Sequence, residues 1–480
     1  MKFKLDSDKR LPRYRRLASS IRKSIESGQL QPGDSVPSTR DLAKELKLAR
    51  VTVITAYDEL ISQGYLKTVS GSGTFVLTPA EHAEFEELKL DVDAPPADKH
   101  LSSYAARIMK LQQLTSTSAD QPVLNFGASP MDLLPLKQWR TLLQKHCSIN
   151  IGKRFDTDLD PMGFRPLREA LAKYLKRVRG LNCNADMIAV FASSQQTVNL
   201  ILRLLVNKSE QVAMENPGFV FARKTIRSLD AEVLPISVDK DGMVVSELNN
   251  HPACKIAYVT PSHQDPTGAI LSSRRRHALL DWAASNNCFI IEDDYDCEYN
   301  YGTPPLQSLQ GQDQDQSVIY ISTFWKILFP IMPIGFVVVP PVLIPALAKA
   351  KMLAERNFSL LEQYALTDFI NEGYLDRHIS KTRKLYAERR RVLISALTRA
   401  FGQAIKIPKY SSGMHITIHL ETKLSDKEIL ARAALADLPL VSTEEYYIAG
   451  HSRGEFLVSF AGRSTDGISA RVNKFAKSLQ

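Results

Sequence analysis

The feature that most restricts the fold is a regular alternation of short apolar runs and helical periods between residues 188 and 339. The runs are rich in isoleucine and valine, as strands buried on both faces are. Strands that alternate with helices predict a mostly parallel sheet covered by helices. The expected strands are residues 188–192, 211–215, 256–260, 289–293, 318–322 and 336–339.

One part of this region is apolar enough to suggest a membrane span. Residues 327–348 contain no charged side chain, but they include five prolines. Prolines at that density would break the hydrogen bonding of a helix exposed to lipid. We therefore expect the segment to be core rather than membrane, with Gly335–Val339 as a buried parallel strand.

The end of the chain has a different pattern. After about residue 360, long charged helical periods lead to two alternating apolar runs, 415–420 and 456–460. Alternation with a period of two is typical of half-buried strands. The fold class is therefore α/β, with a mostly parallel large sheet and a small C-terminal α+β subdomain.

Residues 1–77 predict three helices followed by a β hairpin with a glycine turn. This segment holds 14 basic and 8 acidic residues, which is +6 of the formal +9 of the whole chain. A compact basic segment of this outline is typical of a winged helix-turn-helix, whose third helix enters the major groove of DNA.

Residues 78–122 form the expected linker between a DNA-binding domain, 1–77, and a large domain, 123–480. The linker is acidic and contains consecutive prolines in its middle, so it cannot build a core of its own. Within it, residues 104–114 can form one helix.

The order of residues in the first segment resembles the GntR family of bacterial transcription regulators nearly end to end. The matching runs are LQPGDSVPSTRDLAKEL at 30–46, RVTV at 50–53 and GSGTFV at 71–76. The resemblance implies DNA contacts by Arg40, by Arg50 and Thr52, and by Ser70 and Gly71 in the wing.

Elementary chemistry agrees with those roles, because arginine can bridge guanine or a phosphate and a glycine wing lets backbone N–H groups approach the DNA. The alternative is that Arg40 and Arg50 are solvated surface charges. Ala49 departs from the family, which usually has a Ser or Thr helix cap there.

Polar residues gather where the expected strands end, which is where open α/β sheets place their ligand crevice. Ser193–Gln196 follow one strand and open a helix, Asp293 and Tyr295 close another, and Lys326 follows a third. A helix N-terminus for a phosphate, a carboxylate and an imine-forming lysine are the groups that pyridoxal 5′-phosphate (PLP) requires.

These motifs resemble the fold-type I aminotransferase domain. The matching runs are PMGFRPLR at 161–168, SQQ at 194–196, ENPGF at 215–219, TPSHQDPTG at 260–268, EDDYD at 292–296 and STFWK at 322–326. Placed behind a GntR-type segment, they are similar to the MocR subfamily of regulators, and the similarity spans nearly the whole chain.

The resemblance implies a role for each matching residue. Lys326 would bond covalently to PLP, Asp293 would partner its pyridine nitrogen, and Tyr295 would hydrogen-bond the ring hydroxyl. The remaining expected contacts are Phe219 on the ring face, and Ser194, Gln195 and Thr323 on the phosphate. No catalytic residue and no metal site are assigned.

Three positions depart from the family pattern. Asp265 stands where an asparagine is usual, Pro333 where an arginine binds the phosphate, and Leu457 where an arginine grips a substrate carboxylate. An apolar side chain cannot replace a bidentate arginine. Arg453 and Arg463 lie nearby in sequence as candidate substitutes.

The sequence therefore predicts a cytoplasmic regulator that binds operator DNA, holds PLP through Lys326 and senses a small molecule without efficient transamination. Five widely spaced cysteines favour a reducing compartment. The resemblance also implies a homodimer, with each winged helix reaching the partner's large domain. Two alternatives are a PLP-dependent aminotransferase with an appended DNA-binding module, and a regulator whose large domain has lost PLP and serves as a dimer scaffold.

Overall fold

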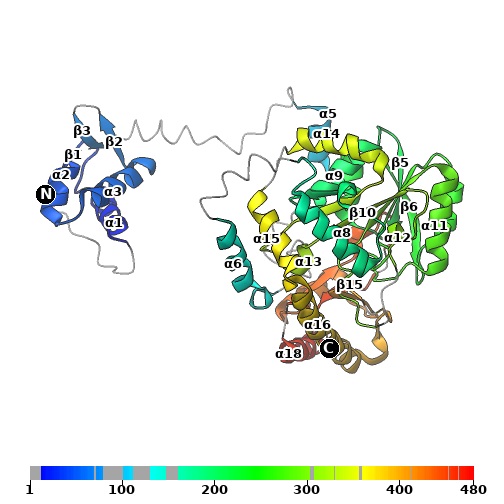
Figure 1. The fold of residues 1–480 in the computed structure, drawn as a ribbon. Helices are drawn as coiled ribbons and strands as arrows, with labels where there is room; N and C mark the ends of the chain where they lie inside the picture. Colours follow the sequence, from blue (N-terminus) through cyan, green and yellow to red (C-terminus); the bar gives the residue numbers. More distant parts are fainter. Residues whose placement is uncertain are drawn as a thin grey trace. The chain divides into compact units, whose positions relative to one another are not determined.

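The structure of the chain is a computed structural model. It describes residues 12–69, 72–78, 101–111, 130–147, 160–302, 307–328, 330–355, 359–410, 412–451, 453–462 and 464–479. The chain divides into two compact units, residues 1–100 and 101–480 (Figure 1). Each unit is described by itself.

The first unit has the expected three helices and hairpin. Its elements are α1 (Arg13–Glu26), β1 (Ser35–Val36), α2 (Thr39–Leu46), α3 (Arg50–Ser62), β2 (Leu66–Val69) and β3 (Gly73–Val76). The sequence pattern did not predict β1, which pairs antiparallel with β3 and extends the hairpin to a three-stranded sheet of order β1-β3-β2. The winged helix-turn-helix outline is confirmed.

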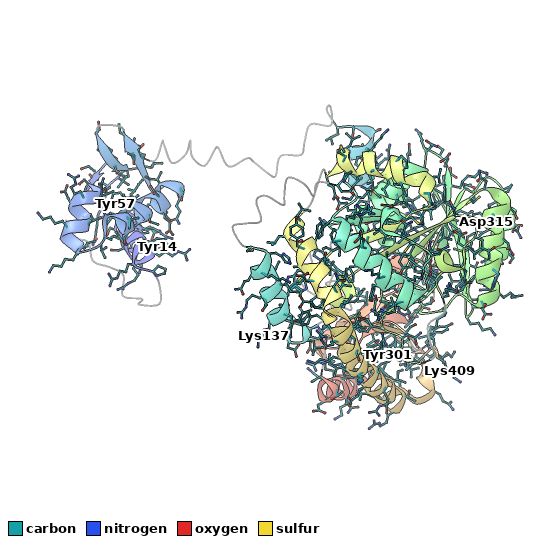
Figure 2. All side chains as sticks on the ribbon, viewed as in Figure 1. Tyr14, Tyr57, Lys137, Tyr301, Asp315 and Lys409 are labelled. Carbon is teal, nitrogen blue, oxygen red and sulfur yellow. The ribbon has the colours of Figure 1, made fainter. Side chains whose placement is uncertain are left out.

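Apolar periodicity explains how this unit folds. Leu17, Ile21, Val53 and Leu60 are fully buried in one core, because residues spaced three or four apart share a helix face. Tyr57 is buried in the same core (Figure 2). Its hydroxyl donates to the Pro37 carbonyl at 2.8 Å. This bond ties α3 to the segment that precedes α2.

The caps of α2 and α3 differ. The Ser38 hydroxyl accepts from the Asp41 N–H at 3.2 Å and so caps α2, whereas Ala49 at the start of α3 makes no side-chain cap bond. A missing cap of this kind costs about 1 kcal/mol of local stability.

The second unit contains two sheets. The strands are β4 (Ile188–Phe191), β5 (Gln211–Asn216), β6 (Glu232–Asp239), β7 (Gly242–Met243), β8 (Ile256–Val259), β9 (Phe289–Asp293), β10 (Val318–Thr323), β11 (Gly335–Val338), β12 (Ile405–Lys406), β13 (His415–Leu420), β14 (Leu440–Ser442) and β15 (Glu455–Ser459). The large sheet has the order β4-β11-β10-β9-β8-β5-β6-β7, and the small sheet the order β12-β13-β15-β14.

Helices surround both sheets. The α-helices are α5 (Ser103–Lys110), α6 (Leu136–His146), α8 (Arg165–Arg179), α9 (Ser194–Leu205), α10 (Val220–Ser228), α11 (Ser273–Asn286), α12 (Leu309–Gln312), α13 (Trp325–Leu328), α14 (Ile344–Ala354), α15 (Leu360–Asn371), α16 (Tyr374–Phe401), α17 (Asp426–Leu435) and α18 (Thr465–Leu479). Short 3-10 turns occupy Met131–Leu133, Ala185–Met187, Val245–Asn250, Pro341–Leu343, Gly402–Ala404 and Glu444–Tyr446.

The large sheet is buried on both faces, as the apolar runs predicted. Helices α9, α10 and α14 pack on one face, and α8 and α11 pack on the other (Figure 1). In the small subdomain, α16, α17 and α18 pack on one face of the antiparallel sheet. All six expected strands of the large sheet and both alternating runs of the small sheet are present, so the α/β fold class is confirmed.

The direction of β11 corrects one expectation. The strand is buried as predicted, but it runs antiparallel to both β4 and β10 rather than parallel. A parallel return to the sheet needs a crossover of about a dozen residues or more, usually with a full helix. Only residues 324–334, with the one-turn helix α13, separate β10 from β11, so the chain turns straight back.

The apolar stretch around β11 lies in this sheet. Across the part of the chain that the structure describes, no helix is both long enough and apolar enough to cross a bilayer.

Helix α5, which falls in the expected linker, belongs to the second unit. The Nε of Arg107 donates to the Ser228 carbonyl at 3.1 Å, and its guanidinium lies 3.7 Å from Asp230. The guanidinium of Arg203 lies over the ring of Tyr104 at 5.1 Å. The contacts bind α5 to the last turns of α9 and α10.

Gly335 gives a sharp test of the close packing in this fold. A Cβ at this position would lie 2.5 Å from the Ser194 backbone nitrogen, where neither main chain can move away. Gly335→Ala should therefore lower the free energy of unfolding by at least about 1 to 3 kcal/mol, the usual range for overpacking, as measured by chemical denaturation. Gly462→Ala is the matched control, because nothing lies within 4 Å of its added Cβ. Equal stability of the two variants would contradict the packing described.

Candidate cofactor site and DNA-binding face

The expected site residues share one edge of the large sheet. The carboxyl ends of β5, β8, β9 and β10 meet there because these strands are parallel. Because β11 is antiparallel, its first residue, Gly335, lies at the same edge and pairs with Phe191 and Thr323. Ser193 after β4, Asp293 at the end of β9 and Lys326 after β10 therefore lie at this edge.

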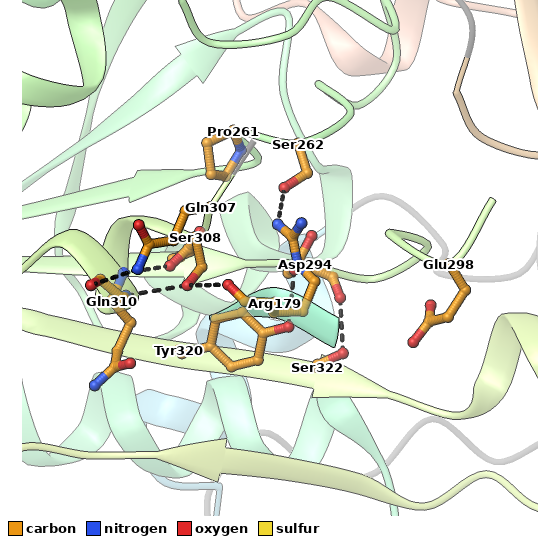
Figure 3. Close-up of polar contacts among 12 residues, drawn as sticks. Arg179, Pro261, Ser262, Asp294, Glu298, Gln307, Ser308, Gln310, Tyr320 and Ser322 are labelled. Carbon is orange, nitrogen blue, oxygen red and sulfur yellow. Dashed lines mark hydrogen bonds and ion pairs between the residues drawn. The ribbon is translucent and has the colours of Figure 1, made fainter. Parts of the chain in front are cut away.

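A buried ion pair holds the loop after β9. The Nε of Arg179 donates to Asp294 at 2.7 Å, and another nitrogen of the same guanidinium donates to the Ser262 hydroxyl at 2.6 Å. The hydroxyl of Tyr320 donates to the Asp294 carboxylate, and that of Ser322 to its carbonyl, at 2.8 and 2.7 Å (Figure 3). Burial alone would raise the pKa of Asp294, but Arg179 and these hydrogen bonds lower it overall. The carboxylate is therefore ionised and fixed.

Lys326 lies among acidic and phenolic groups. Its Nζ is 6.0 Å from the centre of the Tyr295 ring, and Asp296 and Asp265 are the carboxylates that act on it. Burial lowers the pKa of Lys326 below its usual value, and the two carboxylates only partly oppose this effect. A lowered pKa increases the fraction of neutral amine, which is the form that attacks a carbonyl carbon.

Asp293 is a buried carboxyl group at the end of β9. The Tyr258 hydroxyl donates to it, and within the described residues it forms no ion pair. Burial raises the pKa of Asp293 to about 7, even though the Tyr258 hydrogen bond lowers it. A buried carboxyl group in this state would gain free energy from a cation placed beside it.

His263 links Tyr295 to Asp296. Its Nδ1 lies 3.0 Å from an Asp296 carboxylate oxygen and 3.2 Å from the Tyr295 hydroxyl, and that hydroxyl donates to the His263 carbonyl at 3.0 Å. The ring of His415 is 5.1 Å from that of His263. Burial and the neighbouring His263 and Lys326 lower the pKa of His415 well below its usual value, so His415 is neutral near pH 7.

The amino end of α9 is the expected phosphate corner. The Ser193 hydroxyl accepts from the Gln196 N–H at 3.2 Å, and Ser194 is the first helical residue, with its backbone against Gly335. Free N–H groups in a first helical turn attract anions. The structure therefore presents Ser194 at this corner.

Two other expected phosphate contacts already have partners. The Gln195 amide donates to the Thr225 hydroxyl at 2.8 Å, and the Thr323 hydroxyl donates to the Ile334 carbonyl at 3.1 Å. Nearby, the Gln196 amide donates to Glu355, which pairs with the buried Lys351. These residues surround the corner where Pro333 supplies no charge.

Phe219 and Leu457 complete the positions named from the sequence. Phe219 follows β5 at the start of α10 and is partly buried, with no contact joining it to Lys326 in the described residues. Leu457 lies in β15 and is fully buried. Arg453 donates to the carbonyls of Lys423 and Leu424, whereas Arg463 lies outside the described residues.

The expected DNA-binding residues of the first unit lie on and near α3. Arg40 at the start of α2 and Arg50 at the start of α3 are exposed, and in the described residues neither forms an ion pair. Thr52 is partly buried, and Val51 beside it is 66% exposed. The first turn of α3 is thus open to a partner. Ser70 and Gly71 of the expected wing lie outside the described residues.

Sequence reasoning missed Tyr258 and Glu215. Tyr258 lies inside β8, and the strand register alone brings it beside Asp293. Glu215 is buried at the end of β5 and accepts from the Thr260 N–H and hydroxyl at 3.1 and 2.5 Å. A charged residue ending an apolar strand was the available signal for Glu215. No local sequence pattern indicates that Tyr258 contacts Asp293.

Comparison with known proteins identifies the architecture. Residues 121–471 match the family of class I and II aminotransferases, and residues 13–76 match the bacterial regulatory proteins of the gntR family. The probable rhizopine catabolism regulatory protein MocR of Rhizobium meliloti is 34% identical over 90% of this chain and 86% of its own length. The chain belongs to the MocR subfamily of GntR-type regulators.

Two further similarities fit this MocR-type architecture. The pyridoxine biosynthesis regulator PdxR of Corynebacterium glutamicum is 30% identical over 79% of this chain and 78% of its own. A kynurenine aminotransferase of Pyrococcus horikoshii, solved in complex with PMP, superposes with a TM-score of 0.68 at 26% identity. That match covers 82% of this chain and 98% of the enzyme.

The residues of this MocR-type domain fit PLP. An amine, a buried carboxyl group that forms no ion pair among the described residues, and the amino end of a helix stand at one edge of the sheet. These are the partners for an aldehyde, a pyridine nitrogen and a phosphate, respectively. The fit is incomplete at the phosphate, because Pro333 adds no positive charge.

Asp265 gives a pH-dependent test of the site's electrostatics. Burial raises its pKa from 3.8 to about 6, although Lys326 and His263 lower it. The folded state therefore binds a proton more tightly than the unfolded state, and stability falls as pH rises through about 6. Asp265→Asn removes this effect, so between about pH 5 and about pH 8 the variant should gain about 1.4 kcal/mol of unfolding free energy relative to wild type.

Thermal and chemical unfolding at the two pH values would measure the gain. Asp281→Asn, at an exposed carboxyl group of α11, is the control and should show no such difference. A gain that is equal at both pH values would contradict the raised pKa of Asp265.

Proposed function

We propose that this MocR-type regulator binds PLP in its large unit and senses a small molecule there, without efficient transamination. The observation that carries the proposal is that Lys326, whose Nζ lies 6.0 Å from the centre of the Tyr295 ring, and the buried Asp293 stand at the same edge of the sheet. The MocR relative supports regulation, and the PMP-bound aminotransferase supports the cofactor.

Each residue has a defined task in this proposal. Lys326 would hold the cofactor through its amine, and Asp293 would partner the ring nitrogen. Tyr295 would hydrogen-bond the ring oxygen. Phe219 would pack on the ring, and Ser194, with Gln195 and Thr323, would hold the phosphate. When bound, PLP supplies an electrophilic carbon and a conjugated ring that report on amines nearby.

The lack of arginine at two positions favours sensing over catalysis. Turnover of free amino acids needs a firm grip on both the phosphate and the substrate carboxylate, and arginine is the residue suited to both. Pro333 and Leu457 stand at those two positions. Release of a keto acid at enzyme-like rates would favour the aminotransferase alternative.

Regulation is proposed to follow from a shift between conformations. A ligand that binds one arrangement of the large unit more tightly raises its population. In the proposed homodimer, each winged helix reaches the partner's large unit. The shift would therefore change the distance between the two winged helices that bind DNA. The operator affinity then depends on the ligand.

Lys326→Ala tests the cofactor role. Wild-type protein mixed with PLP should gain a visible absorbance band, and borohydride should fix the cofactor to the protein permanently, because a lysine amine holds it. The variant should lose the fixed cofactor. Mass spectrometry of the borohydride-treated protein gives the readout, and Lys349→Ala, at an exposed lysine of α14, is the matched control. Wild-type protein that takes up no PLP would instead support the dimer-scaffold alternative.

Arg50→Ala tests the DNA-binding face. Loss of one guanidinium at the start of α3 should weaken operator binding by about 1 to 3 kcal/mol and reduce its salt dependence. Binding isotherms at several salt concentrations measure both effects. Lys137→Ala removes one exposed charge from the second unit and should leave affinity unchanged. An unaltered isotherm for Arg50→Ala would remove that residue from the interface.

A further inference from the structure

A cavity of about 230 Å³ opens on the second unit where three segments meet. These segments are the end of α8, the loop after β9 and the first turns of α16. The described residues that line the cavity include none of the expected cofactor contacts, neither Lys326 nor any of the others. The cavity is therefore a candidate ligand site of its own.

Apolar side chains form the inner walls of the cavity. Tyr174 and Val178 line it from α8, and Ile379 lines it from α16. Tyr174 and Ile379 are buried. An apolar cavity of about 150 Å³ is already large enough to hold benzene. The space beside these walls can therefore take one six-membered ring with a small polar substituent.

Two arginines at the cavity already have acidic partners. Arg177 donates to both carboxylate oxygens of Asp376, at 2.9 and 2.8 Å, and its guanidinium lies 5.7 Å from the centre of the Tyr174 ring. Arg179 is held by Asp294 at 2.7 Å (Figure 3). These two positive charges are therefore compensated within the protein.

Arg383 of α16 differs from both of them. Its Nε donates to the Glu298 carbonyl at 2.7 Å, which fixes the guanidinium beside the cavity. Among the described residues, its two terminal nitrogens form no hydrogen bond or ion pair. Two parallel N–H groups of a guanidinium match the two oxygens of a carboxylate. Arg383 thus presents a fork for a carboxylate at the cavity.

The Ser380 hydroxyl lies near this fork. Ser380 lines the cavity three residues before Arg383, so the two side chains share one face of α16. Within the described part of the chain, its hydroxyl forms no hydrogen bond. A hydroxyl group can donate to the same anion that a guanidinium binds.

Glu298 is the carboxyl group of this cavity that has no basic partner among the described residues. One of its oxygens accepts from the Tyr174 hydroxyl at 3.1 Å. Burial raises the pKa of Glu298 to about 7, so much of this group is protonated near neutral pH. A protonated carboxyl group can donate a hydrogen bond to an anion and repels it less than a carboxylate does.

We propose that this cavity binds a small carboxylate that carries a single apolar ring. The terminal nitrogens of Arg383 and the hydroxyl of Ser380 hold the carboxylate, and the ring lies against Tyr174 and Ile379. This inference goes beyond the proposed function, because the site needs neither PLP nor Lys326.

Benzoate and benzamide test the inference. The two molecules have nearly the same shape, but only benzoate carries a negative charge. Each would be titrated by calorimetry into the full-length protein without added PLP. We expect benzoate to bind at least tenfold more tightly than benzamide, because only a carboxylate forms a charged pair with Arg383. Equal affinity, tighter binding of benzamide, or no binding of benzoate would overturn the inference.

Arg383→Gln tests the source of this preference. The variant should bind benzoate at least tenfold more weakly than wild type and should bind benzamide almost as wild type does. Arg391→Gln is the matched control, because Arg391 is an exposed arginine of the same helix that does not line the cavity. The control should keep the wild-type affinity for benzoate. An Arg383→Gln variant that folds and binds benzoate as tightly as wild type does would refute the assignment.

Ser380→Phe tests the position of the site. The added ring would fill the cavity between α8 and α16, so the variant should lose the binding of both molecules. Circular dichroism would establish that each variant is folded. If Arg383→Gln does not fold, Ser380→Phe and the wild-type comparison still decide. A folded Ser380→Phe variant that binds benzoate as wild type does would place the ligand elsewhere and overturn the inference.

The two proposals fail in different ways. Protein that takes up no PLP but binds benzoate at this cavity overturns the proposed function alone. Protein that holds PLP through Lys326 but shows no preference for benzoate overturns this inference alone.

Discussion

The ion pair between Arg179 and Asp294 fixes the edge on which the candidate site is built. It joins the end of α8 to the loop after β9, and its hydrogen bonds reach Ser262 after β8 and Tyr320 on β10. Breaking such a buried pair leaves a charge without a partner, which usually costs about 3 to 5 kcal/mol. The neighbouring Asp293 and Tyr295 keep their positions because this pair holds Asp294.

A second constraint is the balance of charge around Lys326. Three carboxyl groups lie close to one lysine and one histidine, and burial raises the pKa of Asp265 and Asp293. A folded protein tolerates such a cluster at a cost in stability, which is common at functional sites. The two groups thus differ, because the charges of Arg179 and Asp294 compensate each other, whereas the carboxyl groups around Lys326 outnumber the basic groups beside them.

Local patterns predicted most of the fold because the six expected strands of the large sheet are short apolar runs, and several of these runs end at a polar residue. They gave Asp293, Lys326 and Ser194 a common edge, since parallel strands share their carboxyl ends. They could not give the direction of β11, which the length of the connection decides. Nor could they give Tyr258 as the partner of Asp293, or Thr417 as the partner of Pro266, because those contacts depend on the register between distant segments.

The roles assigned to the individual site residues stay predictions. Geometry brings Lys326, Asp293 and Tyr295 to one place, whereas Gln195 and Thr323 already satisfy their polar groups within the protein. A bound phosphate would have to share or replace those bonds. The sequence motif does not reveal these bonds, because Gln195 and Thr323 both stand at positions that match the family pattern.

Through its contacts, α5 is joined to the site by the two helices α9 and α10. Ser194, the first residue of α9, and Phe219, which precedes α10, stand at the edge of the sheet where the candidate site lies. Their last turns carry Arg203 and Ser228, which contact Tyr104 and Arg107 of α5. A helix is stiff along its axis over such lengths of roughly 14 to 18 Å. A displacement of either helix along its axis at this edge would therefore move the end that contacts α5.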